Sequence, residues 1–156
     1  MGVEIERKFL VAGADWRQRV TSSNMLRQGY LTTGDTGVTV RVRTIDDATG
    51  FITIKSGGST LTRAEFEYEV PIADALQLLE LTRGARIEKL RHILDLPGGD
   101  WVLDEFHGRH AGLMLVEVEL ESPTAPLDLP GWLGLEVTGD PRYYNSSLAM
   151  PVDGEI

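Results

Sequence analysis

Apolar and polar residues alternate with a period of two along most of this chain. Residues 38–43 read Val-Thr-Val-Arg-Val-Arg, and residues 114–119 read Met-Leu-Val-Glu-Val-Glu. Strict alternation over such stretches is typical of β-strands rather than helices. We therefore expect eight strands, at residues 3–11, 25–33, 37–45, 50–57, 62–70, 86–96, 100–107 and 113–121. Their connections are short and carry turn residues, which favours antiparallel neighbours.

Helices are expected in only three places. Residues 72–81 combine helix-forming residues with apolar positions three and four apart, and Gly84 follows as a stop signal. Residues 14–20 predict a shorter helix, and Asp140-Pro141 can begin a third that runs to residue 149. Residues 122–131 contain three prolines and are expected to form a loop. With 156 residues and no linker, the chain predicts one domain, residues 1–156, of the α+β class and mainly β.

The composition excludes several classes of protein. Lys and Arg number 15 against 24 Asp and Glu, a net charge of −9, so the chain as a whole repels nucleic acid. The absence of cysteine excludes disulfides, thiolate metal sites and cysteine nucleophiles. No apolar run approaches the roughly 20 residues of a membrane span, and the N-terminus lacks a secretory signal pattern. We expect a cytoplasmic protein with no nucleic-acid partner and no membrane partner.

The polar faces of the expected strands carry an unusual set of charges. Residues of like sign occur in pairs two positions apart, at Glu4 and Glu6, Arg41 and Arg43, Lys89 and Arg91, and Glu117 and Glu119. Such pairs share one face of a strand about 7 Å apart, and their repulsion weakens an exposed sheet. All three lysines, Lys8, Lys55 and Lys89, also fall on these charged faces. This pattern suits a concave face that binds something of both signs.

Eight antiparallel strands are enough to close a small barrel, and two orientations of its wall are open. If the apolar face points inward, the charges are simply solvated. If it points outward, the charges line the lumen, where unpaired ions are costly to bury. Such a lumen needs water, opposite charges, metal ions or an anionic ligand. Converging carboxylates bind Mg²⁺ or Mn²⁺, and neighbouring Lys and Arg side chains bind phosphate oxygens. The pattern alone leaves both orientations open.

A family resemblance favours the second orientation. The segment Glu4-Ile5-Glu6-Arg7-Lys8 resembles the ExExK signature of CYTH-domain proteins, the triphosphate tunnel metalloenzymes. The likeness continues, in the family's order, through residues 27–31, 41–43, 54–56, 63–67, 88–91, 103–106, 115–119, 136–138 and 142–145. The resemblance implies an eight-stranded antiparallel closed barrel with a charged lumen and a few helices packed outside. Among members of the family, the chain is most similar to short bacterial inorganic triphosphatases, which implies metal-dependent hydrolysis of a small triphosphate substrate.

The resemblance also implies roles for individual residues. The metal ligands, for Mg²⁺ or Mn²⁺, would be Glu4, Glu6, Asp104, Glu117 and Glu119. The phosphate-binding residues would be Lys8, Arg41, Arg43, Lys55, Arg63, Lys89, Arg91 and Arg142, the last from a C-terminal helix. The residues with a direct part in catalysis would be Lys8, Lys89 and Glu117. A homodimer is compatible with this reading.

Two departures from the family pattern keep alternatives open. Val102 stands where the family often has an acid, and Tyr144-Asn145-Ser146 stands where relatives often carry lysines. Within the enzymes, a class IV adenylate cyclase or a thiamine triphosphatase is the alternative to an inorganic triphosphatase. Outside the enzymes, the alternative is a non-catalytic module that binds polyphosphate or nucleotide.

Overall fold

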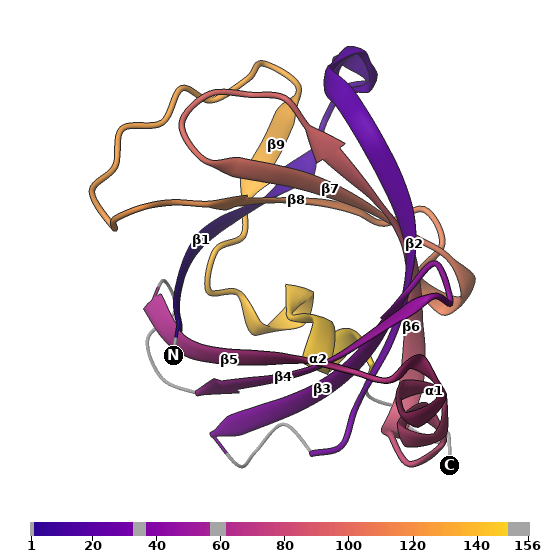
Figure 1. Ribbon diagram of the computed structural model, residues 1–156. Coiled ribbons are helices and arrows are strands. Elements are labelled where there is room, and N and C mark those ends of the chain that lie inside the picture. The colour runs from indigo at the N-terminus through magenta and orange to yellow at the C-terminus, as the bar shows by residue number, and fades with distance from the viewer. Residues whose placement is uncertain (1, 33–36, 57–61, 150–156) are drawn as a thin grey trace.

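A computed structural model of the chain, which describes residues 2–32, 37–56 and 62–149, shows a closed antiparallel barrel (Figure 1). Its strands are β1 (Gly2–Val11), β2 (Val20–Tyr30), β3 (Val38–Ile45), β4 (Thr49–Ser56), β5 (Thr62–Val70), β6 (Arg83–Leu94), β7 (Asp100–Phe106) and β8 (Met114–Glu119). They pair in the order β5-β4-β3-β2-β6-β7-β8-β1, and β1 closes the ring by pairing with β5 as well. The predicted fold class and the eight-stranded barrel are confirmed.

The helices differ from expectation more than the strands do. Helix α1 (Ile72–Glu80) lies where it was predicted, but residues 14–20 form only a 3-10 turn at Asp15–Arg19. The expected C-terminal helix is divided into a 3-10 turn, Pro141–Tyr143, and the short helix α2 (Asn145–Leu148). A further 3-10 turn spans Gly108–His110. In the part of the chain that the structure describes, no helix is long and apolar enough to cross a membrane.

Two features of the sheet were not predicted. Strand β2 begins at Val20 rather than residue 25, because its polar first residues pair with β6 although they show no alternation. A ninth strand, β9 (Leu133–Glu136), pairs with β1 beyond the point where β5 ends. One edge of β1 is thus shared between β5, opposite Gly2–Ile5, and β9, opposite Phe9 and Val11. The expected strand ends at residues 33 and 57 lie outside the described residues.

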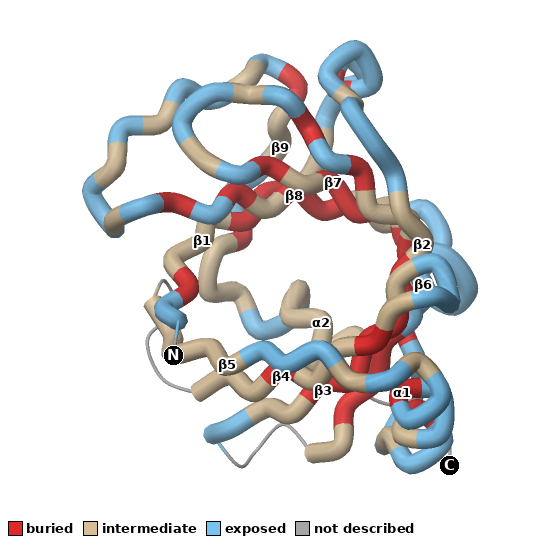
Figure 2. Tube along the Cα trace, viewed as in Figure 1, coloured by how far each residue is buried: buried red, intermediate tan, exposed pale blue. Residues whose placement is uncertain are grey.

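The largest apolar cluster packs against the outer side of the barrel wall. It includes Phe9, Trp16, Trp101 and Trp132, and it is covered by the 3-10 turn at Asp15–Arg19 and by the loop after β8. A second outer cluster joins Val42 of β3 to Ala75 and Leu79 of α1 (Figure 2). Because successive strand residues point to opposite faces, this arrangement turns the charged positions of the strands inward. The barrel is therefore apolar outside and ionic inside.

Close packing of α1 on the barrel predicts a cost for any side chain at Gly50. A Cβ added there would overlap the Cβ of Ala75, whereas nothing lies within 4 Å of a Cβ added at Gly131. We expect Gly50→Ala to lower the free energy of unfolding by about 1–3 kcal/mol. Gly131→Ala should change it by less than about 0.5 kcal/mol. Urea unfolding of both variants measures the difference, and equal midpoints would contradict the packing described here.

Candidate active site

The inward-facing residues of the barrel enclose a cavity of about 260 Å³. Its charged lining contains seven cations, Lys8, Arg41, Arg43, Lys55, Arg63, Lys89 and Arg91, and seven carboxylates, Glu4, Glu6, Glu65, Glu67, Asp100, Glu117 and Glu119. The alternation along each strand places these groups on one face, and the closed ring of strands brings the faces together. Groups from β1 and β3 to β8 therefore meet in one space.

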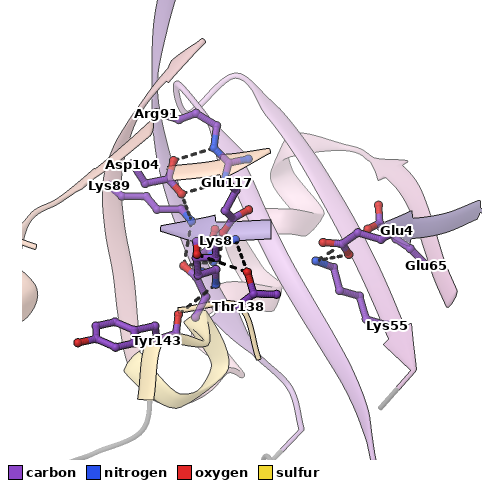
Figure 3. Close-up of polar contacts among 12 residues, drawn as sticks. Glu4, Lys8, Lys55, Glu65, Lys89, Arg91, Asp104, Glu117, Thr138 and Tyr143 are labelled. Carbon is purple, nitrogen blue, oxygen red and sulfur yellow. Dashed lines mark hydrogen bonds and ion pairs between the residues drawn. The ribbon is translucent and has the colours of Figure 1, made fainter. Parts of the chain in front are cut away.

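Each lysine of the chain is bound to a carboxylate in this lumen (Figure 3). Lys55 Nζ lies 2.7 Å from Glu4 Oε2 and 3.8 Å from Glu65 Oε2, and Lys8 Nζ lies 3.4 Å from Glu117 Oε1. These partners come from neighbouring strands of the ring, so the ion pairs join β1 to β8 and the pair β4 and β5 to β1. They also offset the cost of placing charges inside the barrel.

Asp104 is the most heavily bound of the inner carboxylates. Its Oδ2 lies 2.7 Å from Lys89 Nζ, and Arg91 donates two hydrogen bonds to its two oxygens at 2.8 and 2.9 Å. Asp104 is 1% exposed and does not line the cavity. Burial alone would raise the pKa of this carboxyl, but Arg91 and Lys89 hold it well below its usual range. Asp104 therefore acts as a fixed counter-ion that orients two cations.

The two arginines of β3 have fewer counter-ions. Arg43 Nε donates to Gln28 Oε1 at 2.8 Å, and Arg41 Nη2 donates to Thr53 Oγ1 at 3.0 Å. The Nε of Arg41 is buried without a hydrogen-bond partner. Burial and the neighbouring charges of Arg41 and Arg91 lower the pKa of Arg43 well below its ordinary value. Such crowded guanidinium groups form a site that an added anion would stabilise.

The carboxylates of β1 and β5 divide into protonated and charged groups. Burial, the charge of Glu117 and the proximity of Glu4 raise the pKa of Glu6 to about 9. Burial and a hydrogen bond with Glu4 raise the pKa of Glu65 to about 7. Burial opposes ionisation of Glu4 as well, but hydrogen bonding with Glu6 and the charge of Lys55 lower its pKa below the usual range. Glu6 and Glu4 therefore share a proton in the absence of a further cation.

Lys8 and Lys89 respond differently to burial. For Lys8, the charges of Glu117 and Glu6 outweigh burial and raise the pKa of the ammonium. For Lys89, burial prevails over the attraction of Asp104, and the charges of Arg91 and Arg43 add to it, so the pKa falls to about 7. Lys89 can therefore exchange a proton near neutral pH, whereas Lys8 stays charged.

The donor chemistry of the cavity fits a hard divalent cation. Glu6 lies opposite Glu119 in the pairing of β1 with β8, and Glu4 and Glu117 share its surroundings. Carboxylate oxygens are the ligands that Mg²⁺ and Mn²⁺ prefer, and a cation would relieve the repulsion that raises the pKa of Glu6. Within residues 2–32, 37–56 and 62–149, no three carboxylate or imidazole groups are already arranged around a metal position. Metal binding would have to draw Glu4 and Glu117 partly away from their lysines.

The structure brings eleven of the thirteen predicted site residues to the cavity and leaves two outside it. Asp104 lies on the inner face of β7, but Lys89 and Arg91 bind its oxygens and it does not line the cavity. Arg142 is 77% exposed and bound to Asp140, which also accepts a hydrogen bond from its backbone N–H. Because Asp140 caps the Pro141–Tyr143 turn, it holds the guanidinium on the outer surface. Arg142 is therefore absent from the cavity lining, and its place at the mouth of the lumen stays a prediction.

Several lining residues were missed by sequence reasoning. Asp100 lies two residues before Val102 on the same face of β7 and pairs with Glu119, so a carboxylate is present one step from the position that lost one. Alternation along β7 could have identified it. Tyr30, Thr53 and the segment Tyr144–Ser146 also line the cavity. Alternation gives no signal for the last of these, since it belongs to α2 and the residue before it, and only the family motif at residues 142–145 points to this segment.

Comparison with known proteins agrees with this geometry. A family model described as the CYTH domain matches residues 2–144. The chain belongs to the CYTH domain family. This CYTH domain is 43% identical to an inorganic triphosphatase of Acetivibrio thermocellus over 149 residues, 95% of this chain and 94% of that relative. An inorganic triphosphatase of Nitrosomonas europaea is 41% identical over 152 residues, 96% of this chain and 98% of the relative.

Solved structures show the same relationship. A crystal structure of an inorganic triphosphatase is 40% identical to this CYTH domain, with a TM-score of 0.69 and 96% of both chains covered. A protein from Pyrococcus horikoshii is 24% identical, with a TM-score of 0.60 over 77% of this chain and 80% of that chain. The second likeness shows the fold alone. The resemblance inferred from the sequence is confirmed.

The raised pKa of Glu6 predicts a specific pH dependence of stability. Folded Glu6 keeps its proton up to a pH of about 9, whereas the unfolded chain releases it near 4.5, so folding takes up a proton between these values. The free energy of unfolding therefore falls as pH rises through this window. The amide that replaces Glu6 in Glu6→Gln does not titrate, so the free energy of unfolding of this variant should not fall for this reason as pH rises. In metal-free buffer, we expect the variant to gain at least about 1 kcal/mol relative to wild type between pH 5 and pH 9.

Urea unfolding at several pH values measures this difference. Glu121→Gln is the matched control, because Glu121 is an exposed carboxylate outside the lumen. Its stability should run parallel to that of the wild type. Parallel curves for Glu6→Gln as well would show that Glu6 is already ionised in the folded protein.

Proposed function

We propose that this protein hydrolyses the terminal phosphate of inorganic tripolyphosphate, bound in the lumen of the barrel with Mg²⁺ or Mn²⁺. Two relatives that match nearly the whole chain are named inorganic triphosphatases. The observation that carries the proposal is the set of seven cations from five strands that face one cavity. A compact polyanion is the ligand that such a ring of guanidinium and ammonium groups suits best.

The charge balance of the lumen supports a metal requirement. Seven cations face seven carboxylates, so the empty lumen is close to neutral. A triphosphate carries several negative charges and would leave the lumen strongly negative if it entered alone. Divalent cations that accompany it would remove this excess. When bound, the metal neutralises charge that develops on the phosphate oxygens during transfer to water.

The carboxylates of β1 and β8 are the residues that would hold the metal. Glu4, Glu6, Glu117 and Glu119 line the cavity together, and Glu6 would release its proton as the cation binds. Asp104 is less suited than these four, because Lys89 and Arg91 already occupy its oxygens.

The remaining groups of the lumen bind and orient the substrate. Lys8, Lys55 and Arg63 lie on the side of β1 and β5, and Arg41, Arg43, Lys89 and Arg91 lie on the side of β3 and β6. Fixed cations on both sides stabilise charge on the leaving pyrophosphate without reorganisation during the reaction. Glu117, kept ionised by Lys8, can accept a hydrogen bond from the attacking water. Lys89 can exchange a proton near neutral pH.

The size and lining of the cavity favour an inorganic substrate over a nucleotide. Its volume of about 260 Å³ lies below the range of roughly 300–1,000 Å³ typical of pockets for larger organic ligands. Val102, Tyr30 and Tyr144 are the main apolar or aromatic residues of the lining. An adenylate cyclase or a thiamine triphosphatase needs a surface for an organic ring, and this lining provides little of it.

Other parts of the proposal rest on composition. The proposal includes a cytoplasmic location and no nucleic-acid partner, and the net charge of −9 supports the second of these. A homodimer remains compatible with the family relationship.

A substrate panel tests the proposed reaction directly. Phosphate release is measured from tripolyphosphate, ATP, thiamine triphosphate and pyrophosphate at matched Mg²⁺ or Mn²⁺, with cyclic AMP assayed beside ATP. We expect tripolyphosphate to be hydrolysed fastest and activity to disappear when EDTA removes the metal. Formation of cyclic AMP would identify a cyclase, and tight binding without turnover would identify a binding module.

Substitutions in the lumen distinguish residues that bind phosphate from residues that bind the metal. Lys8→Ala should lower kcat/KM by about 100-fold or more, through both kcat and KM, because the substrate loses a charged hydrogen-bond donor to its phosphate oxygens. Glu6→Gln should mainly raise the metal concentration needed for half-maximal activity. Metal titration of both variants makes the comparison, and identical curves would contradict the assignment of roles.

The two arginine positions provide a further comparison. Arg41→Ala removes a buried guanidinium from the cavity and should lower kcat/KM by about 10- to 100-fold. Arg142→Ala should have a much smaller effect, because Arg142 lies outside the cavity. Arg86→Ala, an exposed site paired with Glu80, is the control for loss of an arginine. A larger effect at Arg142 than at Arg41 would contradict the placement of both.

A further inference from the structure

The lumen is ionic at one end and apolar at the other. Inward positions of β1 run from Glu4 to Leu10, and those of β8 run from Glu119 to Leu115. Leu10 and Leu115 belong to an apolar cluster that also contains Ile87 of β6 and Phe106 of β7. Lys89 lies at the boundary, with its ammonium 5.4 Å from the centre of the Phe106 ring. The ionic cavity therefore ends inside the barrel.

The chain after β9 seals the apolar end. Val137, Leu148 and Ala149 join the same cluster, and the backbone N–H of Val137 donates to the carbonyl of Lys8 at 2.8 Å. His110 Nε2 lies 2.7 Å from the carbonyl oxygen of Leu148. Figure 1 shows α2 within the ring of strands rather than on its outer surface. This helix is held from behind by packing and by hydrogen bonds.

The side of this segment that faces the cavity is neutral and contacts two tunnel lysines. Tyr143 accepts a hydrogen bond from Lys8 Nζ through its carbonyl at 3.1 Å, and Asn145 Oδ1 accepts from Lys89 Nζ at 2.8 Å. The ring of Tyr144 lies 5.9 Å from Lys8 Nζ and 6.0 Å from the guanidinium carbon of Arg63. Tyr144, Asn145 and Ser146 line the cavity. The segment is therefore fixed from its cavity side as well.

We propose that Tyr144, Asn145 and Ser146 form the floor of a cup and set the number of phosphate groups that it accepts. This inference rests on the proposed function and specifies its substrate further. A phosphate chain that enters the lumen must stop at this floor, where Lys8 and Lys89 are available to its terminal oxygens. Because the floor is held on both sides, it fixes how far a chain can enter, and a fourth phosphate group would have to lie towards the open mouth, away from Lys8 and Lys89. The depth of the cup then selects triphosphate over tetraphosphate.

Two neighbouring serines provide a matched test. Ser146 lines the cavity, whereas Ser147 is exposed on the same helix. Ser146→Leu raises the floor, and Ser147→Leu adds the same volume on the outside. Dissociation constants for pyrophosphate, tripolyphosphate and tetrapolyphosphate are measured by isothermal titration calorimetry in EDTA, because the proposed reaction would consume tripolyphosphate if Mg²⁺ were present. For Ser146→Leu, we expect binding of tripolyphosphate to weaken about tenfold relative to pyrophosphate. Ser147→Leu should keep the wild-type ratio.

Lowering the floor should act in the opposite direction. Tyr144→Ala removes a large ring from the lining, so tetrapolyphosphate should bind about tenfold better relative to tripolyphosphate than it does to the wild type. Thermal unfolding without ligand verifies that each variant is folded. Each variant is judged by the ratio of its own dissociation constants for two chain lengths. A loss of affinity that is equal for all chain lengths does not change this ratio.

The outcomes separate this inference from the proposed function. If the wild type, Ser146→Leu and Tyr144→Ala show equal ratios of dissociation constants between phosphate chains of different length, the inference that this floor sets the chain length is wrong. This holds even if the wild type hydrolyses tripolyphosphate. Shifted ratios in a protein that releases no phosphate would support the floor and contradict the hydrolase. If Ser147→Leu shifts the ratio as much as Ser146→Leu, the effect comes from the helix as a whole and the inference fails.

Discussion

The fold depends on the neutralisation of charges that the barrel turns inward. Separate ions inside a protein are costly, and fourteen ionic residues line this cavity. Neighbouring strands pair them on the inner face of the wall, as Lys55 does with Glu4 and Lys8 with Glu117. Removing one partner would leave an uncompensated charge, so each pair constrains the register of the strands that carry it. The same requirement explains why the apolar residues lie outside, where turns, loops and α1 cover them.

The ion pairs do not neutralise every charged group of the lumen, and the groups left over suit a ligand. Glu6 is crowded by Glu4 and Glu117, and its raised pKa is the response of a carboxylate that lacks a cation. Arg41 and Arg43 are crowded guanidinium groups, and the buried Nε of Arg41 lacks an acceptor. One side of the lumen would thus be stabilised by a cation and the other by an anion. A metal–triphosphate complex supplies both at once, which a free phosphate or a metal alone cannot do.

Much of this arrangement could be predicted from the sequence, because alternation fixes the face of every strand residue. The charged faces identified ten lining residues, and the family motifs added Arg63 and indicated that these faces point inward. Prediction failed where alternation gives no information. Strand β9 spans only Leu133–Glu136, and the C-terminal segment at the lumen belongs to α2 and the residue before it. Alternation also places Asp104 on the inner face, but it does not reveal that Lys89 and Arg91 enclose its carboxylate. The sequence also does not reveal that the side chain of Arg142 binds Asp140 instead of lining the cavity.

The neutral character of the C-terminal segment follows from the same balance of charges. Lys89 already has Asp104 as a counter-ion, and Lys8 has Glu117. A further carboxylate in place of Asn145 would neutralise the cations that a phosphate must find. Burial and the charges of Arg91 and Arg43 already lower the pKa of Lys89 to about 7, and a further lysine there would add to this repulsion. An amide oxygen and a backbone carbonyl orient the two ammonium groups without consuming their charge. The closed end of the barrel can therefore be packed like a core and still leave both lysines available to a phosphate chain.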